Sequence, residues 1–164
     1  MSNKKIVFIN PPYERIAKGY DFVKHITNNS PSLGLLHLAA EVRLHGYAPK
    51  IIESDILNLS IEQVLAEIEK EQPAYVGITL FTVGVWNALT IAREIKKRFP
   101  KTAIIVGGPH ISSMGKETME RFREFDYAVD GEGEKILVEL LQTLETGGDP
   151  FSVPGIIFRK GPFV

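Results

Sequence analysis

The chain has 164 residues, about one domain, of which 44% are hydrophobic and 24% charged, which is typical of a globular protein. A net charge of −1 gives neither the basic footprint of a nucleic-acid-binding protein nor a polybasic membrane signal, so we expect neither nucleic acid nor membrane as a partner. The absence of cysteine excludes disulfides and any iron–sulfur cluster held by this chain, and no apolar run approaches the ~20 residues of a membrane span, so we expect a cytoplasmic protein.

Strands and helices are predicted to alternate along the whole chain. Short apolar runs predict five strands, at residues 6–10, 50–53, 75–80, 103–106 and 126–129. Apolar stripes with helical spacing predict five helices, at about 32–46, 60–72, 85–99, 117–125 and 134–147. Ser60 and Gln63 form the pattern of a capping box at the start of the second helix. A strand-like segment at residues 155–159 follows the last helix.

Five strand–helix units without internal repeats predict an α/β fold with three α/β/α layers, flavodoxin-like or Rossmann-like. The sheet is expected to be parallel, doubly wound and five-stranded, with strand order 2-1-3-4-5 and the fifth strand at an edge. Ligands of such sheets bind at the carboxyl ends of the strands. The loops at residues 10–31, 79–84, 107–113 and 130–134 should therefore form the site.

The first of these loops excludes several common occupants of the fold. A dinucleotide site requires Gly-x-Gly-x-x-Gly after the first strand, and this turn reads Asn10-Pro-Pro-Tyr-Glu14. The P-loop pattern is absent. The acidic cluster of a receiver domain and the Ser/Thr/Gly-rich phosphate loop of a flavodoxin are absent as well.

Small and hydroxyl-bearing residues instead follow three neighbouring strands. Thr79 and Thr82 follow the third, Gly107-Gly108 the fourth, and Gly131-Glu-Gly133 the fifth. Three strand ends with little side-chain bulk predict a slot for a long, flat or tailed ligand, whose polar groups hydroxyls and free backbone amides can bind.

Five motifs in order carry a resemblance over residues 5–147. They are Asn10-Pro-Pro12, Pro31-Ser-Leu-Gly34, Gly77-Ile-Thr79, Val106-Gly-Gly-Pro-His110 and Asp130-Gly-Glu-Gly-Glu134. With these motifs the chain resembles the N-terminal cobalamin-binding domain of cobalamin-dependent radical SAM enzymes, a group that includes the anaerobic magnesium-protoporphyrin ester cyclase. Residues 1–147 would be that domain, and residues 148–164 would begin the linker to a C-terminal radical SAM domain.

The wider cobalamin-binding fold has three landmarks, of which this chain keeps two. Thr79-Leu-Phe81 stands for a Ser-x-Leu motif, and Gly107-Gly108 matches a Gly-Gly motif. The third, an Asp-x-His-x-x-Gly whose histidine ligates cobalt, is missing, because Asp21-Phe-Val-Lys-His25 has the wrong spacing and no following glycine. The resemblance therefore implies cobalamin bound base-off, with its nucleotide tail displaced and without that histidine.

The resemblance and the loop positions together give the predicted cofactor-binding residues. They are Asn10, Pro11, Pro12, Thr79, Leu80, Phe81, Thr82, Gly107, Gly108, Pro109, His110, Gly131, Glu132 and Gly133. No catalytic residue and no metal ligand are expected. Structural roles stay open for several of them: Thr79 as a strand-end residue, His110 as a loop residue, and Glu132 as a carboxylate that offsets a helix dipole.

In relatives of this kind a second domain carries a Cys-x-x-x-Cys-x-x-Cys motif, a [4Fe-4S] cluster and S-adenosylmethionine, none of which this chain would hold. The chain alone would bind cobalamin and catalyse nothing, within a methyltransferase or a cyclase-like enzyme. A flavodoxin-like nucleotide or flavin sensor without catalytic activity is the alternative function, and a docking domain that has lost its ligand is a third.

Overall fold

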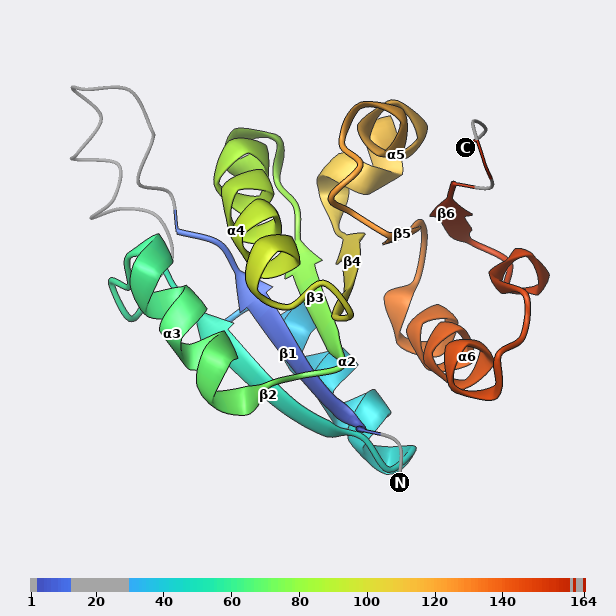
Figure 1. Ribbon diagram of the computed structural model, residues 1–164, viewed down its shortest axis with the longest axis horizontal. Coiled ribbons are helices and arrows are strands. Elements are labelled where there is room, and N and C mark those ends of the chain that lie inside the picture. Colours follow the sequence, from blue (N-terminus) through green and yellow to red (C-terminus); the bar gives the residue numbers. More distant parts are fainter. Residues whose placement is uncertain (1–2, 13–29, 160, 162–163) are drawn as a thin grey trace.

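The computed structural model describes residues 3–12, 30–159, 161 and 164. Its centre is a six-stranded sheet in the order β2-β1-β3-β4-β5-β6 (Figure 1). The strands are β1 (Lys5–Asn10), β2 (Ala48–Glu53), β3 (Tyr75–Thr79), β4 (Ala103–Gly107), β5 (Tyr127–Val129) and β6 (Ile156–Phe158). The first five run parallel in the predicted order, which confirms the doubly wound α/β class.

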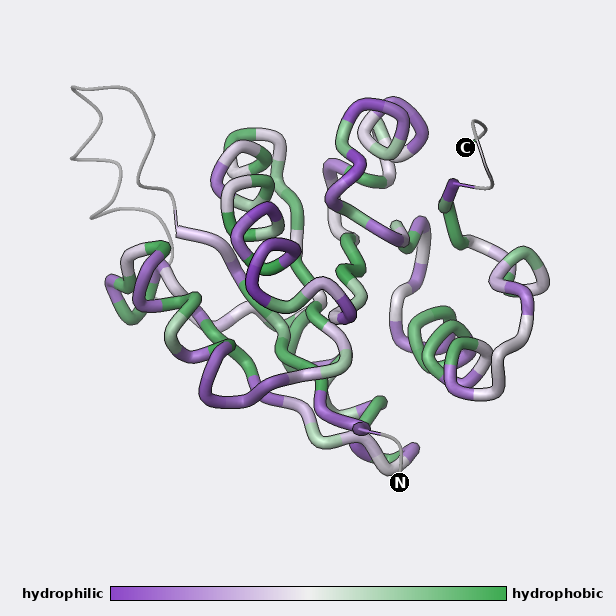
Figure 2. Tube along the Cα trace, viewed as in Figure 1, coloured by the Kyte–Doolittle hydropathy of each residue, from purple (hydrophilic) through white to green (hydrophobic). Residues whose placement is uncertain are grey.

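Helices cover both faces of the sheet and divide the core into two layers (Figure 1). The helices are α2 (Leu33–Leu44), α3 (Ile61–Glu71), α4 (Val85–Arg98), α5 (Pro109–Arg121) and α6 (Gly133–Thr146), with 3-10 turns at Thr82–Gly84 and Pro150–Ser152. Helices α3, α4 and α5 pack on one face, and α2 and α6 pack on the other. Figure 2 shows the apolar residues gathered along the central strands and on the helix sides that meet them.

The ends of the helices follow from their capping residues. The Ser60 hydroxyl accepts a hydrogen bond from the backbone N–H of Gln63, and the Gln63 side chain accepts one from the Ser60 N–H, so the predicted capping box is present. Gly147 ends α6 in the left-handed conformation at φ 70°. Within the described part of the chain, no helix is long and apolar enough to cross a membrane.

Two sequence-based expectations about the end of the sheet were wrong. The sheet has six strands because Ile156–Phe158 pairs antiparallel with β5, so β5 is an inner strand and not an edge. The Arg159 guanidinium reinforces this pairing, because it donates hydrogen bonds to backbone carbonyls in the last turn of α5 and in the segment between α5 and β5, those of Met119, Phe122, Arg123 and Phe125. The domain boundary at residue 147 stays a prediction, although residues beyond it complete this sheet.

Helix α5 begins eight residues earlier than expected. Its N-cap is Gly108 and its first residue is Pro109, a proline position that suits a first helical turn because its missing N–H has no partner there in any case. The helix is kinked at Met114, where φ is −138° and ψ is 25°. The segment 109–113, expected to be a loop, is therefore the first turn of a helix.

Candidate functional site

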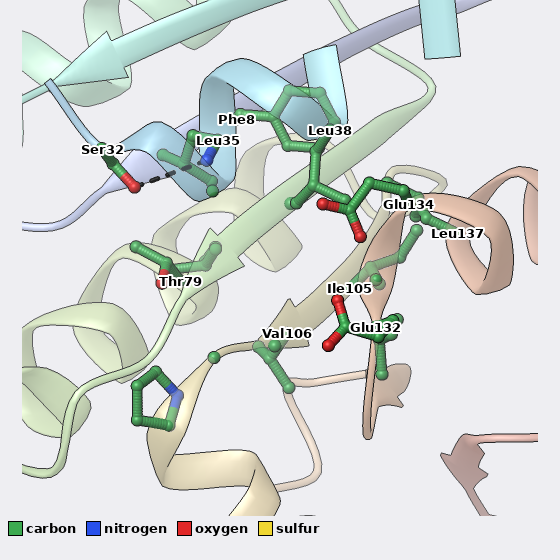
Figure 3. Close-up of a pocket in the computed structure, with 18 of the residues that line it drawn as sticks. Phe8, Ser32, Leu35, Leu38, Thr79, Ile105, Val106, Glu132, Glu134 and Leu137 are labelled. Carbon is green, nitrogen blue, oxygen red and sulfur yellow. Dashed lines mark hydrogen bonds between the residues drawn. The ribbon is translucent and has the colours of Figure 1, made fainter. Parts of the chain in front are cut away.

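The carboxyl ends of β3, β4 and β5 open into a pocket of about 330 Å³ on the α2/α6 face of the sheet. Thr79 and Gly107 are register partners at the ends of β3 and β4, so these two strands stop side by side. The pocket extends from this edge down between α2 and α6 (Figure 3). It has the predicted position at the carboxyl edge and reaches further into the fold than a surface slot would.

The floor of the pocket is apolar and includes a glycine in the middle of the sheet. Phe8, Ile105 and Val129 contribute side chains, and Gly77 contributes bare backbone. A Cβ at Gly77 would lie 2.7 Å from Cδ1 of Phe8, closer than real Cβ contacts allow. The absence of a side chain at residue 77 therefore lets the Phe8 ring lie over β3 as the base of the cavity.

The walls come from two helices that are far apart in the sequence. Gly34, Leu35 and Leu38 line the α2 side, and Glu134 and Leu137 line the α6 side. Gly133 lies where the helices approach, and a Cβ there would be 3.1 Å from Cδ2 of Leu38. The two walls are therefore mainly apolar, with a glycine where α6 meets the Leu38 side chain.

One rim of the pocket is fixed by a tight turn after β4. Gly108 has φ 97°, a conformation that side chains rarely adopt, and a Cβ there would lie 2.9 Å from Oγ1 of Thr79. The Leu80 N–H donates to the Gly107 carbonyl (2.7 Å), and the His110 N–H donates to the Leu80 carbonyl (3.0 Å). The β3 and β4 exit loops are thus hydrogen-bonded to each other, and any side chain at position 108 would be strained.

Oxygen atoms gather around the mouth. The hydroxyls of Ser32 and Thr79 and the carboxylates of Glu132 and Glu134 belong to lining residues, and Figure 3 shows both carboxylates directed toward the open space beside β3. One Glu134 oxygen lies 3.9 Å from Nδ1 of His37 on α2. The mouth is therefore rich in hydrogen-bond acceptors above an apolar interior, which suits a ligand that carries amide or hydroxyl donors on an apolar body.

Eight of the fourteen predicted cofactor-binding residues line this pocket: Thr79, Phe81, Gly107, Gly108, Pro109, Gly131, Glu132 and Gly133. The other six do not. Leu80 is fully buried in the opposite core layer, and Pro11 and Pro12 are buried as well. Asn10 donates to the Glu53 carboxylate at 3.0 Å, and the Pro12 carbonyl accepts from the Asn87 side chain. Asp21 and His25, considered for a cobalt ligand, lie outside the described residues.

His110 and Thr82 are bonded to each other beside the pocket. The Nδ1 atom of His110 is 3.1 Å from Oγ1 of Thr82, and its Nε2 is 2.9 Å from Oγ1 of the buried Thr118, beyond the kink in α5. Burial lowers the pKa of His110, which favours the neutral ring, with one nitrogen as donor and the other as acceptor. Both ring nitrogens of His110 therefore already have partners within the protein, and His110 does not line the pocket. Its contact with a cofactor stays a prediction.

The sequence reasoning missed the α2 wall and the floor. In the sequence, Ser32 and Gly34 stand only as residues of a motif at the start of the first helix, Leu35 as part of its apolar stripe, and Gly77 as a motif residue within a strand. Two signals were available: glycine at the second position of a helix, and glycine inside an otherwise apolar strand, which marks a close approach to a neighbouring group. Neither signal says which other element lies opposite.

Comparison with known proteins identifies the family. A family model described as B12 binding domain matches residues 21–141, about three quarters of the chain. The chain belongs to the B12-binding domain family. The resemblance inferred from the five motifs is thereby confirmed.

Relatives of this B12-binding domain are longer proteins. It is 30% identical over 160 residues to an uncharacterized methyltransferase of Pyrococcus horikoshii, covering 98% of this chain and 34% of that protein. It is 28% identical over 152 residues to the cobalamin-dependent radical SAM methyltransferase TokK of Streptomyces tokunonensis, covering 90% and 17%. The chain thus spans 34% or less of the length of these two relatives.

The fold has a counterpart among experimental structures. The cobalamin-dependent S-adenosylmethionine radical enzyme OxsB, in its structure with aqua-cobalamin bound, superposes with a TM-score of 0.78 at 18% identity, covering 96% of this chain and 21% of OxsB. This likeness shows that the B12-binding domain has the same fold.

Proposed function

We propose that this B12-binding domain holds cobalamin with the nucleotide tail in the pocket between α2 and α6 and the corrin ring over the carboxyl edge of the sheet. The observation that carries the proposal is the continuity of the pocket, which extends from the Gly107-Gly108 turn down to Phe8 and Gly77. A planar base on a flexible stem fits such a narrow, mainly apolar space.

The residues present fit this cofactor in size and polarity. A volume of about 330 Å³ is at the small end for ligand sites, enough for a tail but not for a corrin macrocycle with its substituents. The ring would lie outside, against backbone at Gly107, Gly108 and Gly131. Glu132 and Glu134 would accept hydrogen bonds from donor groups that pass the mouth.

The binding mode would leave cobalt without a histidine from an Asp-x-His-x-x-Gly motif. The spacing in Asp21-Phe-Val-Lys-His25 departs from that motif, and a tail inserted between α2 and α6 cannot also ligate cobalt. When bound, cobalamin would supply a cobalt centre able to carry a methyl group. The base-off state is tested by the absorption spectrum, because loss of the lower nitrogen ligand shifts the main visible bands to shorter wavelength.

Binding itself is tested with two corrinoids. The wild-type chain is titrated with hydroxocobalamin and with cobinamide, which has the corrin ring but no nucleotide tail. Tight binding of cobalamin and much weaker binding of cobinamide supports the tail position, and equal affinities contradict it. Thermal stabilisation by FMN or a nucleotide and not by cobalamin would favour the flavodoxin-like sensor instead.

For the whole protein we propose a cobalamin-dependent radical SAM methyltransferase. The names of the relatives from Pyrococcus horikoshii and Streptomyces tokunonensis support methyl transfer. The [4Fe-4S] cluster and S-adenosylmethionine would then be bound outside this chain. Reading the gene beyond Val164 tests the proposal: a Cys-x-x-x-Cys-x-x-Cys motif is expected, and an open reading frame without it would contradict it.

A further inference from the structure

The helix that forms one wall of the pocket begins with an incomplete local cap. In α3 the N-cap Ser60 and the third helical residue, Gln63, bond reciprocally to each other's backbone N–H. In α2 the N-cap Ser32 accepts from the Leu35 N–H at 3.4 Å, but Leu35 has no acceptor to return to the Ser32 N–H. The sequence of α2 therefore provides only half of a capping box.

A carboxylate from another element provides the other half. Oε1 of Glu53, the last residue of β2, accepts a hydrogen bond from the Ser32 N–H at 2.7 Å. Its other oxygen, Oε2, accepts from Nδ2 of Asn10 at 3.0 Å. Asn10 and Glu53 are register partners at the ends of β1 and β2, so the carboxylate is held against the sheet while it binds the start of α2.

The position that a local capping box would use is occupied by a pocket residue. Leu35 is 3% exposed and lines the cavity together with Ser32 and Gly34. A glutamate or glutamine at residue 35 would bring a polar group into the apolar wall. The carboxylate from β2 allows leucine at this position and still satisfies the Ser32 N–H, at the helix end where negative charge is favourable.

We propose that Glu53 is the positioning residue for the α2 wall of the cofactor pocket: by completing the cap of α2 from β2 it fixes Ser32, Gly34 and Leu35 against the ligand. This role rests on the proposed function, because it presumes that the ligand tail lies along this wall. Glu53 does not line the pocket itself and acts through Ser32.

Four variants distinguish the positioning role of Glu53, through its hydrogen bonds to Ser32 and Asn10, from a general effect on stability. Glu53→Leu removes both acceptors. Glu53→Gln keeps both contacts of residue 53: the amide oxygen of Gln accepts from the Ser32 N–H, and its NH₂ group donates to Oδ1 of Asn10 after the Asn10 amide rotates. The rotation has little cost, because Oδ1 of Asn10 is buried without a partner in the wild type and Nδ2 takes its place as the unpaired atom in the variant. Asn10→Asp places two carboxylates face to face. Asn10→Asp with Glu53→Gln restores a donor–acceptor pair of reversed polarity.

The affinities for hydroxocobalamin and cobinamide are measured for each variant. We expect Glu53→Leu and Asn10→Asp to weaken cobalamin binding about tenfold, with cobinamide affinity within about twofold of wild type. Glu53→Gln and the double variant should stay within about threefold for both. If Glu53→Leu fails to fold, the isosteric Asn10→Asp and double variants still decide.

Two outcomes overturn the role of Glu53. One is an unchanged ratio of cobalamin to cobinamide affinity in Glu53→Leu and Asn10→Asp, including an equal loss for both ligands, which would indicate a purely structural residue. The other is a double variant as weak as Asn10→Asp. A wild-type chain that binds both corrinoids equally refutes the tail position as well, so failure of the proposed function is recognised before any variant is made.

Discussion

Thr79 and Gly108 face each other across the rim of the pocket, with Oγ1 of Thr79 only 2.9 Å from where a Cβ on residue 108 would lie. The neighbouring glycine differs. A Cβ on Gly107 would have its nearest contact at 3.7 Å, to the Val129 carbonyl, which is an ordinary van der Waals distance. The two positions of this motif therefore favour glycine for different reasons. Residue 108 needs a backbone conformation that side chains rarely adopt, whereas at residue 107 glycine leaves space in the pocket.

Alanine substitutions at residues 107 and 108 should therefore have different effects on the free energy of unfolding. Gly108→Ala forces a Cβ into the Thr79 hydroxyl at φ 97°, and we expect it to lower the free energy of unfolding by about 1–3 kcal/mol. Gly107→Ala should change it by less than about 0.5 kcal/mol. Urea unfolding followed by circular dichroism measures both. Equal losses at the two positions would contradict the difference in their roles.

Gly34 allows the pocket to be filled without strain. A Cβ there has no neighbour closer than Oγ of Ser32 at 4.0 Å, so Gly34→Ala should stabilise α2 by up to about 1 kcal/mol. Gly34→Trp should fold and reduce cobalamin affinity about tenfold or more, because the indole occupies the mouth. Cobinamide titration is the control. Unchanged cobalamin affinity in Gly34→Trp would place the tail elsewhere.

Gly77 and Phe8 should be energetically coupled. Gly77→Ala brings a methyl group to 2.7 Å from the Phe8 ring, and we expect a loss of about 1–3 kcal/mol of stability. Phe8→Leu removes the ring edge, so the double variant should lose about 1 kcal/mol less than the sum of the single variants. Chemical denaturation of all four proteins measures the coupling, and strict additivity would show that the contact is not limiting.

Acidification should weaken the fold through His110. Because burial lowers the pKa of His110 below its unfolded value, the unfolded chain binds the proton more tightly. The contribution of this residue is therefore complete above about pH 6.5 and is lost as the pH falls through the lower, folded pKa. Urea unfolding at pH 7.5 and pH 5.5 should give a smaller difference for His110→Asn than for wild type. An identical difference in both proteins would exclude His110 as the titrating group.

Removal of residues 148–164 should destabilise the domain. The deletion exposes the edge of β5 and frees the backbone carbonyls of Phe122 and Arg123, just after α5, that Arg159 binds, so we expect the melting temperature to fall by about 10 °C. Arg159→Met in the full chain, which keeps β6, should cause a smaller loss. If the shortened chain melts at the temperature of the full chain, residues 148–164 are a linker, as the sequence suggested.

Local patterns predicted the positions of the first five strands and most of the helices, because apolar runs and caps such as Ser60/Gln63 are encoded within a few residues. The order of those strands followed from the doubly wound fold class. The sixth strand was harder to predict. Ile156–Phe158 has three residues, and its antiparallel pairing depends on a partner and on a turn at Gly155, whose φ is 84°. The early start of α5 was missed because Gly108-Pro109 was interpreted as a loop, when proline at a first helical position is also a start signal.

The candidate site likewise has a part that the sequence predicts and a part that it does not. The β4 and β5 exits could be predicted, because glycines after apolar strands of a parallel sheet meet at one edge. The α2 wall could not, because Leu35 has the same helical spacing whether it faces the core or a cavity. Only the packing of α2 beside α6 turns Gly34 and Leu35 into pocket residues, and that packing is a property of the assembled sheet.

The two walls of the pocket are separated by roughly a hundred residues, at Ser32–Leu38 and Gly133–Leu137. A chain emerging from the ribosome has no such cavity until α6 has docked beside α2. If the pocket holds the cofactor tail as proposed, cobalamin can be captured only after α6 has been synthesised. For the same reason, occupancy would join the beginning of the chain to its end. Cofactor supply would then control how long the apoprotein survives proteolysis.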